Sequence, residues 1–452
     1  MSDAATRSYW LGRVPYEPSP SLDGSRTVDL VVVGGGLTGL WSAILLKDAD
    51  PALEIAVLEQ KTVGYGASGR SAGLATAAIG RGLTGLIRRV GAEPARTLHR
   101  AMIAALRDIV DFADAEGIHA SITHPGVLTV SSGPEQDALI ARDLDAAAML
   151  DTELQALDGS ACRDLVRVAG ARCGHLSPHG VLLDPAALTR GLEGAARRRG
   201  IQVFAGTPVD AVETIGGQRV EARTPYGTVH ADRAILATNA YAHAFASLRR
   251  FVFTTYVSAV VTGRLSDEEW SRIGWERRMG IEDRRTLPHI CRPTPDGRIL
   301  WGGGDVSLAP TGPNPRRDRD PVRLASLAAS LRASFPQLPE LRIEQEWSGP
   351  VCGTADGLPL VRWLRGERVL GVLMSGRGLV ASRLVAEGVR DVLLNRATEL
   401  ASSPLIARRP LPLPPEPVRS VLLSTLQRNL AYAEEHADKA GLVARVARGW
   451  LS

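Results

Sequence analysis

Six consecutive residues near the N-terminus, Gly34 to Gly39, have the types and spacing of a dinucleotide-binding turn. They read GGGLTG, which fits the pattern G-x-G-x-x-G. An apolar run at 30–33 precedes them, a helical pattern continues to Lys47, and a second apolar run covers 54–58. The first glycine permits a tight turn, the second lets the backbone approach a pyrophosphate, and the third lets helix and strand pack closely. The segment therefore predicts a β-α-β unit whose helix N-terminus faces phosphate groups.

Two further features indicate which dinucleotide binds. Glu59 ends the second predicted strand, twenty residues after Gly39, where a carboxylate accepts hydrogen bonds from ribose hydroxyls and repels a 2′-phosphate. A glycine-rich polar loop at 64–73 follows, and it contains Ser68 and Arg70. Such a loop suits a second phosphate-cradling segment beside a flavin, for which an NAD enzyme has no use. We therefore expect FAD.

The elements that must position this site alternate along the chain. Apolar spacing and capping residues predict helices at 94–116, 134–150, 185–199, 323–335 and 379–394. Strands are predicted at 201–204, 211–214, 219–224, 228–230, 234–238, 290–294, 298–302, 342–347 and 369–374. The strands between 201 and 230 should form an antiparallel meander, and Asp296-Gly297 marks a hairpin.

Composition excludes several classes of protein. The chain has 452 residues, 44% hydrophobic and 23% charged, with a net charge of +4, which is ordinary for a soluble globular protein of about two domains. Basic residues are scattered among acidic ones, so we expect no nucleic-acid surface. The four cysteines show no metal-binding spacing, and no segment reads as a signal peptide or a membrane span. We expect a cytoplasmic protein without a metal site.

Several stretches in order resemble the D-amino acid oxidase–like superfamily of FAD enzymes, and most nearly its γ-glutamylputrescine oxidase–like branch. They are SYW at 8–10, VVVGGGLTGL at 31–40, VGYGASGRSAG at 63–73, the segment 184–209, AILATNAY at 234–241, CRPTPDGRILWGGGD at 291–305, WSGPVCGTADGLP at 347–359 and SGRGL at 375–379. The resemblance implies an α/β fold (α+β overall), in which a Rossmann-type FAD-binding domain is interleaved with a substrate domain built on an antiparallel sheet with helices. The expected parts are an arm at 1–26, an FAD-binding domain at 27–85, 172–246 and 346–402, a substrate-binding domain at 86–171 and 247–345, and a tail at 403–452.

The resemblance also assigns residues to the cofactor. Val209 should present its backbone to the adenine, residues 237–239 should pass near the pyrophosphate, and Gly349 with 376–379 should lie beside the isoalloxazine. Together with the motifs above, the expected FAD-binding residues are Gly34, Gly36, Leu37, Thr38, Gly39, Glu59, Gln60, Lys61, Gly66, Ala67, Ser68, Gly69, Arg70, Gly73, Val209, Ala237, Thr238, Asn239, Gly349, Gly376, Gly378 and Leu379.

The chain departs from the family pattern in three places. Arg377 stands where many relatives have histidine, and Ser71-Ala72 stands where the branch usually has Asn-Gly. Cys352 lies near the cysteine that holds FAD covalently in the sarcosine-oxidase branch, but it is offset from that motif and too close to Asp356. We therefore interpret Cys352 as a structural thiol and expect non-covalent FAD.

The family's chemistry is hydride transfer from the carbon beside an amine nitrogen to flavin N5, followed by hydrolysis of the imine to an aldehyde or keto acid and ammonia. The resemblance thus predicts a small-amine oxidase or dehydrogenase with a substrate sheet at 251–304. The candidate catalytic residues are Tyr256, His289, Arg292, Trp347 and Arg377. Arg292 either binds a substrate carboxylate or phosphonate or makes a structural ion pair, and His289 reads more as a satisfied polar residue than as a base. Arg277, Arg278, Arg284 and Arg285 read as a solvated face, with an anionic-substrate funnel as the alternative.

Lysine scarcity bears on the electron acceptor. The chain has three lysines, Lys47, Lys61 and Lys439, and none is expected beside the flavin, where some oxidases of the superfamily use a lysine to activate oxygen. Oxygen and another electron acceptor both remain open. Two alternative functions also remain: a hydroxy-acid or glycerol-phosphate type dehydrogenase, and a non-catalytic flavoprotein subunit that interacts through its tail. Leu422, Leu426 and Leu430 give that tail near-helical apolar spacing, which core packing or a homodimer contact would also explain.

Overall fold

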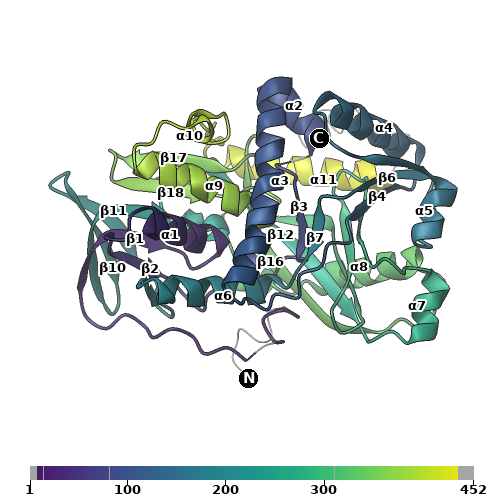
Figure 1. Ribbon diagram of the computed structural model, residues 1–452, viewed down its shortest axis with the longest axis horizontal. Coiled ribbons are helices and arrows are strands. Elements are labelled where there is room, and N and C mark those ends of the chain that lie inside the picture. Colours follow the sequence, from purple (N-terminus) through teal and green to yellow (C-terminus); the bar gives the residue numbers. More distant parts are fainter. Residues whose placement is uncertain (1–7, 14, 81, 310, 436–452) are drawn as a thin grey trace.

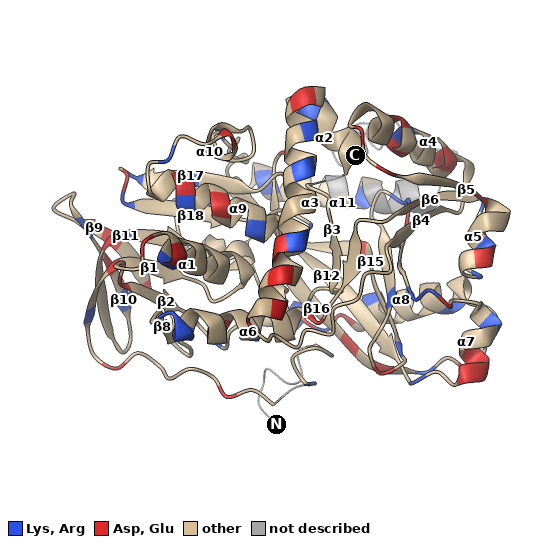
Figure 2. Ribbon diagram, viewed as in Figure 1, with Lys and Arg blue, Asp and Glu red and all other residues tan. Residues whose placement is uncertain are grey.

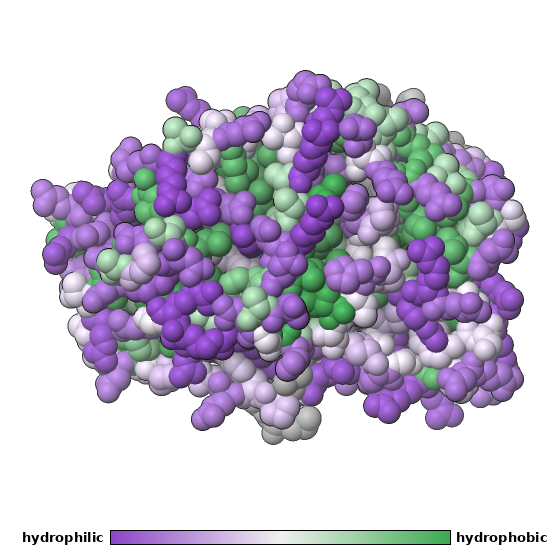
Figure 3. Space-filling model, viewed as in Figure 1, coloured by the Kyte–Doolittle hydropathy of each residue, from purple (hydrophilic) through white to green (hydrophobic). Residues whose placement is uncertain are grey.

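The computed structural model describes residues 8–435 except 14, 81 and 310, and it shows two large sheets side by side (Figure 1). The long helix α3 (Ala92–Ala115) runs between the two halves. Charges of both signs are interspersed over the elements in this view (Figure 2). The space-filling view shows a mostly hydrophilic face with apolar patches beside the central helix (Figure 3).

The first sheet is the predicted dinucleotide-binding sheet. Its strand order is β17–β18–β11–β1–β2–β8, with β9 and β10 attached through β11. The strands are β1 (Arg26–Val33), β2 (Ile55–Leu58), β8 (Gln202–Phe204), β9 (Ala211–Ile215), β10 (Arg219–Thr224), β11 (Gly227–Leu236), β17 (Leu360–Arg365) and β18 (Val369–Leu373). Strand β1 pairs in parallel with both β2 and β11. Its residues 30–33 are buried on both faces of the sheet, as their continuous apolar run predicts.

Side chains of β1 alternate between two cores. Leu30 and Val32 pack toward the helices, and Val31 and Val33 pack toward the meander of β9 and β10. The helices on the first side are α1 (Leu37–Ala49), α3, α6 (Pro185–Arg198) and α9 (Gly378–Leu393). Asp184 caps α6 by accepting hydrogen bonds from the backbone of Ala186 and Ala187, as the sequence predicts.

The second sheet has the order β16–β12–β15–β14–β13–β4–β6–β5 and is mostly antiparallel. Its strands are β4 (Val127–Ser131), β5 (Gln155–Asp158), β6 (Cys173–Ser177), β12 (Val252–Thr262), β13 (Gly280–Asp283), β14 (His289–Pro293), β15 (Ile299–Ala309) and β16 (Ile343–Thr354). The remaining helices are α2 (Leu83–Val90), α4 (Pro134–Met149), α5 (Gly159–Leu165), α7 (Asp267–Ile273), α8 (Pro321–Ser334), α10 (Glu399–Ser402) and α11 (Val418–Glu435). Two short strands, β3 (Leu74–Thr76) and β7 (Gly180–Leu182), pair with each other.

The structure corrects three details of the sequence interpretation. The strands predicted at 228–230 and 234–238 are one strand, β11, because its two halves continue the same pairing with β1 past the exposed Asp232. Strand β6 pairs with β4 and β5, so the sheet boundary falls after Ser177 rather than at 172. Strand β16 pairs with β12 along its whole length, so the second sheet also extends beyond 346.

The tail is helical where the structure describes it. Helix α11 buries Leu423 against Phe253, Leu308 and Leu413, which is core packing, whereas Leu422 is exposed. The side chains of Leu426 and Leu430 lie outside the described residues, as does the tail from 436 onward. Within the described part of the chain, no helix combines the length and the apolar character that crossing a bilayer requires.

Candidate active site

The glycine turn between β1 and α1 has the close contacts that its three roles require. Gly34 has a φ of +117°, and a Cβ there would lie 2.6 Å from the carbonyl oxygen of Ala237. A Cβ on Gly39 would lie 2.0 Å from the carbonyl oxygen of Gly34, so any side chain would push the helix from the strand. The N-cap of α1, Gly36, provides no side-chain hydrogen bond, and Ser68 accepts one from the backbone N–H of Leu37 at 3.0 Å. The helix N-terminus therefore opens toward the loop at 64–73.

A cavity of about 1360 Å³ begins at this turn and continues to the second sheet. Of the predicted FAD-binding residues, all but Gly39 and Gly69 line it, and those two pack immediately behind. The cavity is larger than the ~300–1,000 Å³ of a drug-sized ligand site, so it has room for a dinucleotide and a second small molecule. The geometry thus brings the sequence-predicted cofactor residues to one continuous surface.

Polar atoms along this surface fit a phosphate-bearing ligand. The hydroxyls of Ser71 and Thr238 and the side-chain oxygen of Asn239 are buried, and among the described residues they have no hydrogen-bond partner. All three residues line the cavity, and Asn239 has a φ of +46° at the start of a short 3-10 helix. Buried polar groups in folded proteins are nearly always hydrogen-bonded, so these atoms mark where a ligand supplies partners.

Glu59, Gln60 and Lys61 line the cavity beside the glycine turn. The Glu59 carboxylate accepts hydrogen bonds from the backbone N–H groups of Gly35 at 2.8 Å and Lys61 at 2.9 Å. Burial raises the pKa of this carboxyl, and the two N–H groups oppose the shift. Each carboxylate oxygen has a further acceptor site, so Glu59 can still bind a hydroxyl.

The loop at 69–73 is held by side chains from three distant segments. Its five successive carbonyls accept hydrogen bonds from Ser8, Trp347, Trp10 and, at the last two positions, Arg292. The donor–acceptor distances are 2.7 Å to Gly69, 3.0 Å to Arg70, 2.9 Å to Ser71, 3.4 Å to Ala72 and 2.7 Å to Gly73. We call these four side chains the loop clamp. With every carbonyl of the segment occupied, the backbone has one orientation toward the cavity.

This arrangement corrects the hypothesis that Arg292 anchors a substrate acid. Its guanidinium also donates to the carbonyl of Leu183 at 2.7 Å and lies 4.9 Å from the centre of the Trp10 ring. The side chain is buried outside the cavity lining, and burial lowers its pKa to about 9. Trp347 likewise uses its indole N–H within the clamp and does not line the cavity. Both residues support the site from behind.

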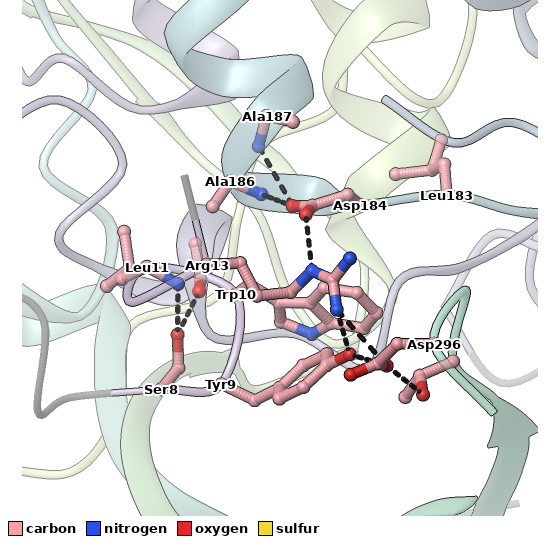
Figure 4. Close-up of polar contacts among 12 residues, drawn as sticks. Ser8, Tyr9, Trp10, Leu11, Arg13, Leu183, Asp184, Ala186, Ala187 and Asp296 are labelled. Atoms are coloured by element: carbon pink, nitrogen blue, oxygen red, sulfur yellow. Dashed lines mark hydrogen bonds and ion pairs between the residues drawn. The ribbon is translucent and has the colours of Figure 1, made fainter. Parts of the chain in front are cut away.

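An ion-pair cluster fixes the N-terminal arm that provides Ser8 and Trp10 (Figure 4). Arg13 lies between Asp184, at 4.0 Å, and Asp296, at 3.1 Å, and Tyr9 donates a hydrogen bond to the Asp296 carboxylate. Burial opposes ionisation of Asp296, but hydrogen bonds from Tyr9, Thr294 and Arg298 outweigh it and lower the pKa to about 2. The hairpin turn of the second sheet therefore holds the arm against the dinucleotide loop.

Two other predicted catalytic residues also lie outside the cavity lining. Tyr256 is buried and exchanges hydrogen bonds with the backbone of Asn314, at 2.8 Å to its carbonyl and 2.7 Å from its N–H. His289 is stacked on Trp301, and its Nδ1 lies 2.7 Å from the Asp283 carboxylate. His289 is thus a satisfied polar residue, as the sequence favoured.

Arg377 is the predicted catalytic residue that lines the cavity. Its guanidinium donates two hydrogen bonds to the Glu282 carboxylate, at 2.6 and 2.7 Å, and a third to Thr76 at 3.3 Å. Although burial lowers it, the Glu282 carboxylate holds the pKa of Arg377 above its usual value. Arg377 is also the N-cap of α9, and its side chain does not cap that helix. The open N-terminus and the ion pair therefore face the cavity together.

A polar row on the second sheet extends from this pair and was not predicted. Glu282, Thr129 and His175 are register partners on β13, β4 and β6, and all three line the cavity. Beyond them, Arg284 donates to Asp143 through Nε at 2.5 Å and Nη2 at 3.0 Å. The prediction of a solvated face is wrong for Arg284, and Arg278 packs 3.4 Å from the Trp270 ring centre. The sequence signal for these residues was weak, because His175 stands in a short alternating run and Asp143 on an alanine-rich helix.

Cys352 also borders the cavity, in β16 beside Gly349. Its side chain is buried, and burial raises the pKa of the thiol to about 12. The neutral thiol is the wrong form for a nucleophile or a flavin linkage.

Comparison with known proteins agrees with this site. Residues 29–392 match the family model described as FAD dependent oxidoreductase, so the chain belongs to this family of FAD-dependent oxidoreductases. The γ-glutamylputrescine oxidoreductase of Escherichia coli is 30% identical over 400 residues, which are 86% of this chain and 90% of that protein. The fold resembles glycine oxidase from Geobacillus kaustophilus, with a TM-score of 0.72 at 18% identity, covering 85% of this chain and 99% of that one. It also resembles L-amino acid deaminase from Proteus myxofaciens, with a TM-score of 0.70 at 14% identity, covering 87% and 96%. The predicted family and mixed α/β fold are confirmed.

Proposed function

We propose that this protein oxidises a small amine with non-covalently bound FAD. The observation that carries the proposal is the single cavity that joins the dinucleotide cradle to the polar row of the second sheet. The relatives' names support the amine, because the similar proteins include a γ-glutamylputrescine oxidoreductase and glycine oxidases.

The residues present fit FAD along the first half of the cavity. Glu59 would hold the ribose, and the α1 N-terminus would hold the pyrophosphate region together with the unpartnered side chains of Ser71, Thr238 and Asn239. Gly349 and Gly376 line the part of the cavity that would hold the flat ring. Bound FAD would supply the hydride acceptor for the substrate. The neutral, buried Cys352 supports non-covalent attachment.

The chain's own groups would position the amine and stabilise charge. The open N-terminus of α9 favours negative charge at the adjoining part of the cavity. The Glu282 carboxylate, already paired with Arg377, gives that wall a fixed and nearly neutral ion pair rather than a free cation. A cationic amine therefore meets little repulsion there, and positioning is the main contribution expected from these residues.

The electron acceptor is a separate part of the proposal. Lys61 lines the Glu59 end of the cavity, and Lys47 donates to the carbonyls of Pro51 and Leu53, each at 2.8 Å. Lys439 lies outside the described residues. We therefore place neither described lysine beside the flavin ring. Two alternatives follow: the electron acceptor is not oxygen, or a cation other than lysine activates oxygen.

Anaerobic mixing of the purified holoprotein with a panel of amines and hydroxy acids tests the function. We expect amines to bleach the flavin absorbance and hydroxy acids to leave it unchanged. Bleaching by hydroxy acids alone would show a different dehydrogenase, and no bleaching by either class would support a non-catalytic flavoprotein. Acid precipitation tests the attachment: FAD should remain in the supernatant, and FAD in the pellet would contradict the proposal.

A further inference from the structure

Arg70 is a buried cation in the wall of the cavity. Its side chain is 2% exposed, and the residue lines the cavity. Its Nε donates to the carbonyl of Tyr65 at 2.8 Å, and the guanidinium lies 4.7 Å from the centre of the Tyr65 ring. The Nη2 nitrogen is buried and has no hydrogen-bond partner within the part of the chain that the structure describes. The protein therefore leaves part of this guanidinium unsatisfied, which is unusual for a buried charge.

The side chain of Arg70 packs against Gly349 of β16. A Cβ on Gly349 would lie 3.0 Å from Cδ of Arg70 and 3.8 Å from its Nη1. Nη1 also lies 3.4 Å from the carbonyl oxygen of Ser348. Ser68 of the same loop binds the N-terminus of α1 instead. Since Gly349 lines the part of the cavity proposed to hold the flat ring of FAD, the Arg70 guanidinium belongs to the ring and not to the pyrophosphate region.

The charge of Arg70 is opposed by a carboxylate that lies at a long distance. The Asp318 carboxylate is 3.3 Å from Nη1, longer than the ~2.7–2.9 Å of a typical charge-assisted hydrogen bond. Arg377, by contrast, donates two hydrogen bonds of 2.6 and 2.7 Å to the Glu282 carboxylate. The charge of Arg377 is thus closely balanced, whereas that of Arg70 is balanced less completely. Of these two arginines, Arg70 has the stronger electrostatic effect on a neighbouring group.

Reduction changes the charge of a flavin ring. The oxidised ring is neutral, and two electrons that arrive with one proton leave it with a negative charge. A fixed cation in a site that excludes water stabilises such a charge, and it favours the reduced form over the oxidised one. A cation beside the ring therefore raises the reduction potential.

We propose that Arg70 supplies the positive charge that stabilises the reduced ring of FAD, and that Asp318 limits the strength of that charge. Arg70 acts on the cofactor directly, and Asp318 is a positioning residue that acts through Arg70. The inference rests on the FAD-binding part of the proposed function, with the ring beside Gly349. It does not depend on which substrate reduces the flavin.

Two equilibria of the FAD-loaded protein measure this charge without an amine. Sulfite adds to the oxidised flavin and leaves the ring negatively charged, and its dissociation constant follows from the loss of flavin absorbance. The two-electron midpoint potential follows from anaerobic reduction with dithionite in the presence of a redox dye. Unit charges about 6–10 Å apart, at an effective dielectric constant of about 20, change such an equilibrium roughly 10- to 100-fold, which corresponds to about 30–60 mV.

Four variants assign the charge to Arg70. Arg70→Met should weaken sulfite binding roughly 10- to 100-fold and lower the midpoint potential, whereas Arg70→Lys should keep most of both. Asp318→Asn should tighten sulfite binding and raise the potential, because it leaves Arg70 unopposed. Arg100→Met is the matched control, since Arg100 also pairs with one aspartate, Asp151 at 3.1 Å, and does not line the cavity. It should behave as the wild type.

Each outcome supports or refutes the role of Arg70. The proposal is wrong if Arg70→Met retains FAD and changes sulfite binding by less than about threefold and the potential by less than about 15 mV. If Arg70→Met loses FAD, Asp318→Asn decides: tighter sulfite binding with a higher potential supports the proposal, and an unchanged or lower potential refutes it. If Arg70→Met weakens the binding of amino acids and leaves the potential unchanged, Arg70 binds a substrate acid instead. If no amine bleaches the flavin, the proposed amine oxidation fails, and these two equilibria still test Arg70.

Discussion

Replacing Arg377 should destabilise the protein more than neutralising Glu282, although both substitutions break the same ion pair. In Arg377→Met, the Glu282 carboxylate loses its two hydrogen bonds of 2.6 and 2.7 Å while its side chain remains 9% exposed. An unpaired buried charge costs about 3–5 kcal/mol, and the 31% exposure of Arg377 shows that water can approach, so we expect the lower value, about 3 kcal/mol. In Glu282→Gln, an acceptor oxygen remains and Arg377 can be solvated from the cavity, so we expect about 1 kcal/mol.

Thermal unfolding of the FAD-loaded variants measures these effects. A loss of about 3 kcal/mol corresponds to a decrease in Tm of roughly 6–12 °C for a domain of about 150–250 residues, and less for a larger one. The double variant carries no buried charge, so it should be more stable than Arg377→Met alone. Additive effects, or an Arg377→Met variant within about 0.5 kcal/mol of the wild type, would refute the coupling.

Three further expectations follow from the supporting contacts. Trp10→Phe and Trp347→Phe each leave one loop carbonyl without its donor, so each should lower the free energy of unfolding by about 1–3 kcal/mol and weaken FAD binding in a fluorescence titration. Trp301→Phe is the control: its indole binds Ser330, so the substitution should lower Tm and leave FAD affinity unchanged. Gly39→Ala should abolish FAD retention on a desalting column, while Gly194→Ala in α6, where a Cβ meets nothing closer than 3.4 Å, should retain it. Asp296→Asn should cost about 2 kcal/mol at neutral pH, since the folded-state pKa is depressed from 3.8 to about 2. That stability is present above the unfolded pKa and is lost as the pH falls through about 2, so acid unfolding curves of variant and wild type should converge there; parallel curves would contradict the assignment.

The cofactor half of the site could be predicted because its signals are local in sequence. The turn at Gly34 to Gly39, the acid at Glu59 and the loop at 64–73 each combine a backbone requirement with a fixed spacing. The structure places nearly all of these residues on one cavity surface. Short-range geometry determines such motifs, so one sequence is sufficient to find them.

The substrate half could not be predicted because it depends on which strands are neighbours. Glu282, Thr129 and His175 are far apart in the chain and meet through the pairing of β13, β4 and β6. Periodicity also cannot tell which element covers a residue. Arg292 and Trp347 lie on strands, as predicted, but their side chains bind the back of the loop at 69–73 instead of facing the cavity.

The loop clamp has a consequence for how the protein acquires its cofactor. Ser8 and Trp10 bind carbonyls 61 residues away, and Arg292 and Trp347 reach across 219 and 277 residues. Contacts between such distant segments form late, because the chain must first close long loops. The loop beside the flavin should therefore reach its final shape only after both sheets have folded and the arm has returned. On this basis FAD capture reports the end of folding, and a nascent chain lacking its last strands would remain without cofactor.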